Sequence, residues 1–197
     1  MPPKAKFTKE QIVDAALAIV RKSGKNALSA RTLAARLGTS PQPIFLHFQN
    51  MEELFCGVLD AAKLKYKHYV EEGLAETLPF KGAGMKYIQF AKDEPELFKL
   101  LFMSGDREAE LSHFFPENDD NSPVVLSALK SFYGLTEEKA KRIYNHISVY
   151  THGLAILFVQ GRRVFSMEEV SGMLTEIFMA LMKSEGIDLT KQPYPGK

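Results

Sequence analysis

The sequence predicts an all-α fold. Apolar residues recur with the 3.6-residue period of a helix along almost the whole chain, and hardly any segment alternates as a half-buried strand would. Residues 29–48 read as a short helix, a glycine turn and a second short helix. The chain has 197 residues, of which 45% are hydrophobic, and this suffices for a small helical domain and a larger one with separate cores.

The first two helices have clear start and stop signals. Thr8 is followed three residues later by Gln11, which is a capping-box pattern, and the apolar stripe that follows stops at Gly24. Ser29 stands where the N-cap of a second helix is expected. Gly38 ends that helix, because glycine readily adopts the left-handed conformation of a tight turn.

The third helix is expected to carry two prolines in its first turn. With Ser40 as N-cap, Pro41 and Pro43 occupy positions whose backbone N–H groups have no intrahelical partner, so both are tolerated. Each proline still removes a donor, which leaves fewer amides to hold a phosphate. Ile44 and Phe48 are expected to face the core. The residues left for the outer face are Gln42, Pro43, Phe45, Leu46 and His47.

A long fourth helix is predicted from Met51 towards Leu74, and it would join the first domain to the rest of the chain. We place the domain boundary at its start, with a helix-turn-helix domain over residues 1–50 and a larger helical domain over residues 51–197. A loop is expected over residues 105–122, and the C-terminal tail is expected to fray. Further helices are predicted over residues 80–93, 95–103, 123–132, 137–161 and 167–184.

The distribution of charge indicates that the first domain binds double-stranded DNA. Residues 1–50 hold eight Lys and Arg against two acidic residues, a net charge of +6, which leaves −5 for the remainder of a chain whose total is +1. Such asymmetry is expected where only one end of a protein meets the phosphate backbone. The alternative is that the basic segment is a solvated face without a partner.

No feature predicts a membrane span or an exported protein. The longest apolar stretch, residues 147–159, is shorter than the roughly 20 residues needed to cross a bilayer. Cys56 is the single cysteine, so no internal disulfide can form, and the N-terminus lacks the apolar run of a signal peptide. We therefore expect a cytoplasmic protein. Cys56 could sense oxidants near the domain junction, or it could be an inert buried thiol.

The sequence argues against an enzyme. It contains no phosphate-cradling glycine loop and no nucleophile motif. Its histidines include no pair at the four-residue spacing that would place two metal ligands on one helix face. We expect neither a metal nor a cofactor.

A specific pattern runs from Gly38 through His47 and Phe48 to Glu53 and Leu54. The same pattern includes, at characteristic spacing, Thr8, Ile12, Ala15, Ala16, Gly24, Ser29, Arg31, Leu33, Ala34, Leu37, Ser40, Pro41, Ile44 and Phe45. In this order and spacing, residues 7–60 resemble the TetR family of bacterial transcriptional regulators. A weaker sign is residues 150–154, YTHGL, which resemble the Trp-His-Gly motif of one C-terminal subclass with Tyr or Thr in place of Trp.

The resemblance implies a homodimer whose last two helices form a four-helix interface, and a regulatory domain that binds a small molecule. It also implies roles for single residues. Ser29 and Arg31 match positions that contact phosphate, and so does His47. Gln42 occupies a base-facing position, where its amide could pair with adenine. The alternatives are that His47 bonds a local carbonyl and that Gln42 is merely exposed.

Three residues depart from the family pattern. Pro43 stands where Thr or Ser is common, Phe45 where Tyr usually offers a hydroxyl, and Met51 where a Lys often binds phosphate. We infer that an N-terminal arm with two lysines compensates by binding backbone or minor groove, and Phe45 could touch a thymine methyl group. The expected DNA-binding residues are Lys4, Lys6, Ser29, Arg31, Ser40, Gln42, Pro43, Phe45, Leu46 and His47.

The larger domain offers apolar and soft side chains for an effector pocket. They would favour an apolar or aromatic ligand, although the same residues could simply form the core of a helical bundle. His152 is the polar candidate among them, and it could equally be a buried structural histidine. The expected ligand-binding residues are Met85, Ile88, Phe98, Leu101, Phe102, Phe132, Tyr150, His152, Leu154 and Phe158.

Taken together, these observations predict a ligand-responsive transcription regulator. Most family members repress, so we expect a homodimer that binds a palindromic operator and is released by a small apolar effector. Activation of transcription by the same switch is the alternative to repression. The alternative is a DNA-binding or architectural regulator that responds to no ligand.

Overall fold

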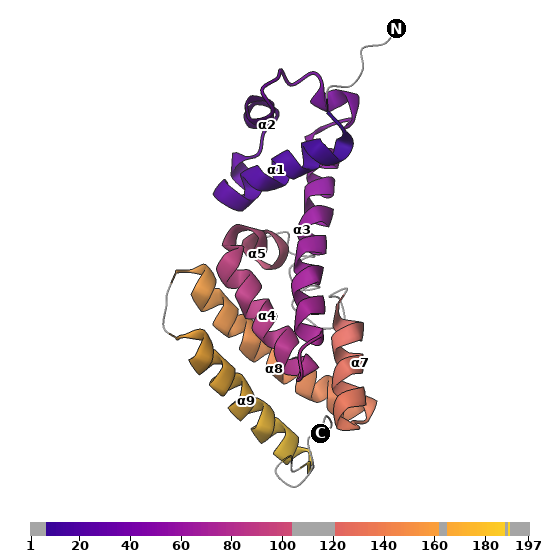
Figure 1. The fold of residues 1–197 in the computed structure, drawn as a ribbon, viewed down its shortest axis with the longest axis vertical. Coiled ribbons are helices and arrows are strands. Elements are labelled where there is room, and N and C mark those ends of the chain that lie inside the picture. The colour runs from indigo at the N-terminus through magenta and orange to yellow at the C-terminus, as the bar shows by residue number, and fades with distance from the viewer. Residues whose placement is uncertain (1–6, 104–120, 162–164, 188, 190–197) are drawn as a thin grey trace. The chain divides into compact units, whose positions relative to one another are not determined.

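The computed structural model describes residues 7–103, 121–161, 165–187 and 189. These residues form helices and no strands, which confirms the all-α fold (Figure 1). The chain divides into two compact units: Met1–Lys65 with Glu94–Ser104, and Tyr66–Asp93 with Gly105–Lys197. The first unit is thus larger than the N-terminal domain expected over residues 1–50, because it includes the start of the long helix and a short helix from after residue 93.

The first unit contains α1 (Lys9–Ser23), the 3₁₀ helix η1 (Lys25–Ala27), α2 (Ala30–Leu37), the 3₁₀ helix η2 (Ile44–Leu46), the first part of α3 (Met51–Leu74) and α5 (Pro95–Phe102). Its core brings together apolar side chains from all four α-helices and from η2. The fully buried members include Ile12, Val20, Leu33, Ile44, Leu54, Val58, Leu97 and Phe98.

The predicted caps of α1 and α2 are present. The Gln11 backbone N–H donates to the Thr8 hydroxyl at 3.2 Å, and the Thr8 N–H donates to the Gln11 side chain at 2.9 Å, so the capping box is complete. Ser29 caps α2. Gly24 and Gly38 end the two helices with φ of 79° and 64°, a conformation that favours glycine.

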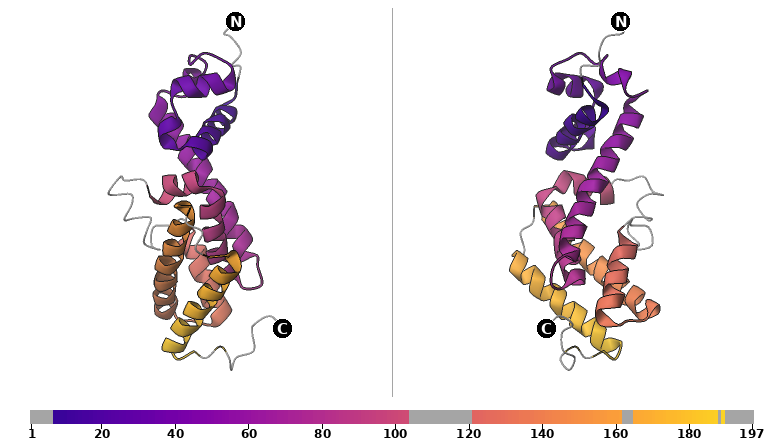
Figure 2. Two further views of the ribbon diagram at one scale, coloured as in Figure 1. Left: turned by 90° about the vertical axis from the view of Figure 1, so that its left-hand side faces the viewer. Right: turned by 45° about the vertical axis from the view of Figure 1, so that its right-hand side comes forward.

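The second unit contains the last part of α3 together with α4 (Pro79–Asp93), α7 (Ser122–Tyr133), α8 (Glu137–Val159) and α9 (Met167–Ser184). Helix α8 packs against α4, α7 and α9, and the views of Figures 1 and 2 agree that α8 and α9 run side by side. The predicted helix ranges agree closely with these bounds. Most of the expected loop over residues 105–122 lies outside the described residues, as does most of the C-terminal tail.

Helices α3 and α4 approach each other closely within the second unit. A Cβ atom placed on Gly73 would lie 2.5 Å from the carbonyl oxygen of Gly82, so this crossing has no room for a side chain. None of the helices in the described part of the chain combines the length and hydrophobicity needed to span a bilayer.

Candidate nucleic-acid interface

The segment after α2 is not the expected α-helix. Residues 41–48 form a turn followed by η2, in which the Ile44 N–H donates to the Pro41 carbonyl at 3.0 Å and the His47 N–H donates to the Ile44 carbonyl at 3.1 Å. Both bonds have the shorter 3₁₀ span. The predicted third helix is therefore wrong in its type, although its place in the chain is right.

The two prolines explain this difference. Pro41 and Pro43 have no backbone N–H to give to a helix, and Pro43 also disfavours the helical conformation of Gln42, the residue before it. The expected N-cap is missing as well, since Ser40 makes no capping hydrogen bond within the described residues. The missing proline N–H groups cost no intrahelical bond in a first turn, so the restriction on Gln42 and the missing cap are what disfavour an α-helix here.

The core-facing side of this segment is as predicted, but Pro43 and His47, expected on the outer face, are half-buried. Ile44 and Phe48 are buried, with 0% and 2% of their surface exposed, whereas Phe45 and Leu46 are 43% and 62% exposed. Gln42 is exposed too. We call Gln42, Phe45 and Leu46 the reading surface. It offers one amide and two apolar side chains, and it carries no charge.

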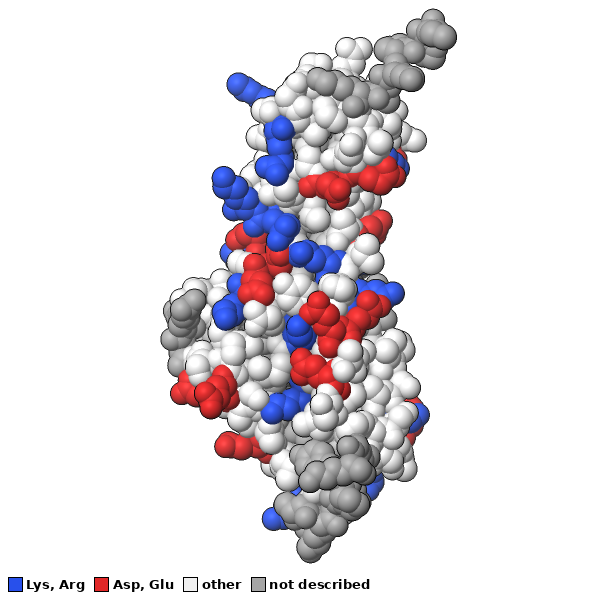
Figure 3. Space-filling view, in the orientation of Figure 1, with Lys and Arg blue, Asp and Glu red and all other residues white. Residues whose placement is uncertain are grey.

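Exposed basic side chains lie on α2, the helix that precedes the reading surface in the chain. Arg31 and Arg36 of α2 are exposed and form no ion pair within the described residues. In Figure 3, Lys and Arg gather over α2 and the C-terminal end of α1. The Ser29 hydroxyl already accepts a hydrogen bond from the Thr32 N–H at 3.2 Å. Lys4 and Lys6 lie outside the described residues.

His47 is less accessible than the resemblance implied. The residue is half-buried, and its Nε2 atom is covered and has no hydrogen-bond partner in the described structure. The alternative that His47 bonds a local carbonyl finds no support, since no hydrogen bond from its ring is found within the described residues. A phosphate could reach the ring through Nδ1, or through Nε2 after the side chain rotates.

The start of α3 is tied to α1 by contacts that the sequence did not indicate. The Asn50 side chain caps α3 by accepting from the Glu53 N–H at 2.8 Å, and Glu53 accepts from the Gln49 N–H at 2.6 Å. That backbone bond lowers the pKa of Glu53. The Lys9 ammonium lies 3.5 Å from Glu53 and 5.0 Å from the centre of the Phe48 ring. These contacts hold in place the end of residues 41–48, which we call the reading segment.

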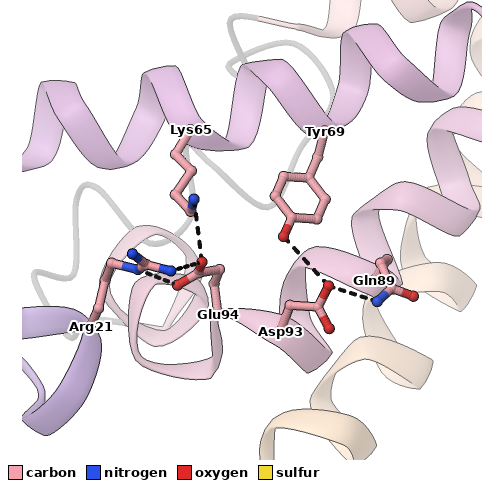
Figure 4. A network of polar contacts seen from close by, with 6 residues as sticks. All are labelled: Arg21, Lys65, Tyr69, Gln89, Asp93 and Glu94. Atoms are coloured by element: carbon pink, nitrogen blue, oxygen red, sulfur yellow. Dashed lines mark hydrogen bonds and ion pairs between the residues drawn. The ribbon is translucent and has the colours of Figure 1, made fainter. Parts of the chain in front are cut away.

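A buried carboxylate joins three helices of the first unit. Glu94, which precedes α5 and is 6% exposed, accepts from Nε of Arg21 at 2.7 Å and pairs with its guanidinium a second time (Figure 4). The Lys65 ammonium of α3 lies 3.4 Å away. Figure 4 also shows a separate cluster of the second unit, in which Asp93 accepts from the Gln89 amide at 2.6 Å and from the Tyr69 hydroxyl at 3.5 Å.

The residues expected to form an effector pocket are divided between the two units. Phe98, Leu101 and Phe102 belong to α5 in the first unit, and the remaining seven belong to the second unit. Ile88 and Leu154 are core residues, 0% and 5% exposed, as is the fully buried Phe98. The alternative of plain core packing holds for these three. Cys56 is exposed, so the alternative of a buried thiol is wrong.

His152 is partly buried in the second unit. Its Nδ1 atom lies 2.7 Å from the hydroxyl of Tyr87, and burial lowers the pKa of the imidazole. This residue does not line the cavity that the second unit contains. That cavity of about 120 Å³ lies among α4, α7, α8 and α9, and it is lined by Leu78, Phe80, Lys81, Gly84, Tyr133, Ile147, Leu174, Thr175, Phe178 and Met179.

The fold and the reading surface define a helix-turn-helix DNA-binding protein with a helical second unit. Residues 12–57 match the family of bacterial regulatory proteins described as the tetR family. The N-terminal unit thus carries a tetR-family DNA-binding domain, and this match points to a transcription regulator and not to an enzyme. The matched range does not reach residues 150–154, so the Trp-His-Gly subclass stays a prediction.

Solved structures share the fold over most of their length. One is a protein of unknown function from Rhodococcus sp. RHA1, with a TM-score of 0.65, 19% identity, and coverage of 90% of this chain and 97% of that one. A single-residue variant of TetR from Acinetobacter baumannii AYE, in complex with minocycline, has a TM-score of 0.56 and 16% identity, with coverage of 92% of this chain and 97% of that one. The fatty acid degradation regulator FadR from Bacillus halodurans has a TM-score of 0.52 and 15% identity, with coverage of 88% of this chain and 94% of that one. No curated protein matches the sequence.

Proposed function

We propose that the protein is a homodimeric transcriptional repressor that binds a palindromic operator and leaves it when a small effector binds. The reading surface carries the proposal. Gln42, Phe45 and Leu46 are presented to solvent by a turn whose Ile44 and Phe48 are buried, inside a tetR-family domain. A compact segment of this kind can enter the major groove while its buried residues keep it in place.

The proposed contacts divide between base edges and backbone. Gln42 pairs with adenine, and Phe45 and Leu46 contact thymine methyl groups. Arg31 neutralises phosphate from the start of α2, and His47 meets phosphate through its accessible edge. The N-terminal arm with Lys4 and Lys6 adds further contacts to the DNA backbone or the minor groove. These two lysines are proposed from the sequence, since they lie outside the described residues.

The dimer is proposed to form through α8 and α9. Val149 on α8 is 57% exposed despite its apolar side chain. Gly153 of α8 and Gly172 of α9 are exposed as well, and within the described residues no atom outside the adjoining helix backbone lies within 4 Å of the position a Cβ would take on either. An apolar face with small residues lets a second pair of helices approach closely, and a two-fold axis would complete a four-helix interface.

The effector is proposed to act on the spacing of the two reading surfaces. In a two-fold dimer these must enter major grooves about 34 to 36 Å apart, one turn of DNA. A ligand in the second unit can shift that spacing only if it binds the released conformation more tightly, by a few kcal/mol. The apolar cavity among α4, α7, α8 and α9 supports the existence of such a ligand.

The proposal is tested by selecting bound fragments from genomic DNA and measuring affinity for the selected site. A palindrome is expected. Insertion of about half a helical turn between its halves should weaken binding by about 100-fold or more, because the second half-site then faces the opposite side of the duplex. Equal affinity for the lengthened site would argue against a dimer that reads both halves. Binding that no small molecule alters would favour the ligand-independent architectural regulator.

A further inference from the structure

The cavity of the second unit has a lysine in its lining. Lys81 and Leu78 line both this cavity and an adjoining, more open groove. Lys81 is half-buried and forms no ion pair within the described residues. Lys86, on the same helix, instead pairs with Glu72 at 2.6 Å. A cation at the edge of an apolar space, with no carboxylate paired to it, is complementary to an anionic group.

The inner walls of the cavity are apolar and partly aromatic. The ring of Phe178 lies 5.6 Å from that of Phe80 and 5.0 Å from that of Tyr133, measured between centroids. The volume of about 120 Å³ corresponds to roughly 8 to 12 water-sized positions. The space therefore suits a ligand of about ten non-hydrogen atoms.

Gly84 keeps this space open without a packing reason. A Cβ on Gly84 would lie 3.7 Å from Leu174 Cδ1 and 4.0 Å from Thr151 Oγ1, which are ordinary contacts. Gly73 differs, because a side chain there would collide with the backbone of Gly82. A glycine inside a helix destabilises it relative to alanine. Glycine at position 84 therefore lowers the stability of the helix, but its missing side chain leaves room in the cavity wall.

A polar atom without a partner lies next to the same wall. Thr151 is 4% exposed, and its hydroxyl makes no hydrogen bond in the described structure. It lies on α8, beside the position that a Cβ on Gly84 would take. Since buried hydroxyl groups are normally hydrogen-bonded, this orphan adds a second group that a ligand can satisfy after a small side-chain rotation.

We propose that this cavity binds a small amphipathic monocarboxylate of about ten non-hydrogen atoms. The apolar body lies against Phe80, Phe178 and Leu174, and the carboxylate meets Lys81 where the cavity opens into the groove. Glu76 lines the groove but not the cavity. Its negative charge disfavours a second anionic group on the ligand. The role of this ligand as the effector rests on the proposed function, but its binding to the cavity does not depend on DNA.

The test measures binding by calorimetry to the full chain, using straight-chain carboxylates from butanoate to dodecanoate and octan-1-ol as an uncharged probe. Affinity is expected to peak near octanoate. Lys81→Gln should weaken octanoate about tenfold and leave octan-1-ol unchanged, because one charge-assisted contact is lost. Lys92→Gln is the matched control, since Lys92 is exposed on the same helix and does not line the cavity.

Cavity variants give an independent check. Gly84→Ala should fold and melt at a higher temperature, whereas Gly84→Met should fill the cavity and abolish binding of both probes. The proposal is overturned if no carboxylate binds, if Lys81→Gln binds octanoate as tightly as the wild type, or if Gly84→Met binds it unchanged. If octanoate binds as expected but leaves a DNA complex intact, the carboxylate site stands and its role as the effector site falls.

Discussion

Arg21, in the last turn of α1, pairs with Glu94, a buried carboxylate 73 residues further along the chain at the start of α5. The pair holds α5 against α1, and Lys65 of α3 adds a second cation. A further sign of close packing is Gly24, where a Cβ would lie 2.8 Å from the Glu96 side chain. The first unit therefore includes a helix that follows α4 in the chain.

A double-mutant cycle measures this pairing. Arg21→Met and Glu94→Gln should each lower the free energy of unfolding by about 1 to 3 kcal/mol, since each removes one partner of the hydrogen-bonded ion pair at the buried Glu94. The double variant should lose less than the sum, with a coupling of about 1 kcal/mol or more. Lys22→Met, at the exposed neighbouring position, serves as control. Additive losses in urea unfolding would show that the two side chains do not stabilise each other.

Pro43→Ala should convert part of the reading segment towards α-helix. The substitution restores a backbone donor and frees Gln42 from the steric restriction that proline imposes on the residue before it. Carbon chemical shifts of residues 44–48 are expected to move towards helical values, with little change in α1. Unchanged shifts would mean that the tertiary contacts of Ile44 and Phe48, and not the prolines, determine the 3₁₀ geometry.

The predictions from sequence succeeded where the signal was local. Thr8, Gln11 and Gly24 specify the ends of α1 through bonds and dihedral angles of neighbouring residues, and all three behave as expected. Pro43 shows the limit of this reasoning, because its own place in a first turn is acceptable while it restricts the backbone of Gln42, the residue before it.

The cavity of the second unit could not be found from residue type. Ile88 and Leu154 have the apolar character of a pocket lining, yet both pack into the core. Periodicity identifies the buried face of a helix, and it does not tell which part of that face borders a cavity. The contact between Arg21 and Glu94 is similarly invisible, because it depends on how α5 returns to α1.

His152 should make stability depend on pH. Burial lowers the pKa of the folded imidazole below its ordinary value of 6.5, so the unfolded chain binds the proton more readily. Stability should therefore fall as the pH drops below about 6.5, and His152→Gln should reduce this loss. His146→Gln, exposed on the same helix, is the control. Equal pH profiles of melting temperature for wild type and His152→Gln would contradict the assignment.

Phe45 and Leu46 should make binding sensitive to thymine methyl groups. Replacing thymine by uracil within the half-sites removes the methyl group and keeps the hydrogen-bonding edges. Affinity is expected to fall several-fold with the wild type and to fall less with Phe45→Ala, which has already lost one of the two contacts. An operator whose uracil form binds as tightly as the thymine form would argue against methyl recognition.

The most direct test of the central claim, that residues 29–48 read DNA, compares Gln42→Ala with Arg31→Ala on the selected operator and on variants of it. Gln42→Ala should cost about 1 to 3 kcal/mol on the operator and relax base preference at one position of each half-site. Arg31→Ala should weaken all sequences about equally and make the salt dependence shallower. Unchanged base preference in Gln42→Ala together with an unchanged salt slope in Arg31→Ala would contradict the claim.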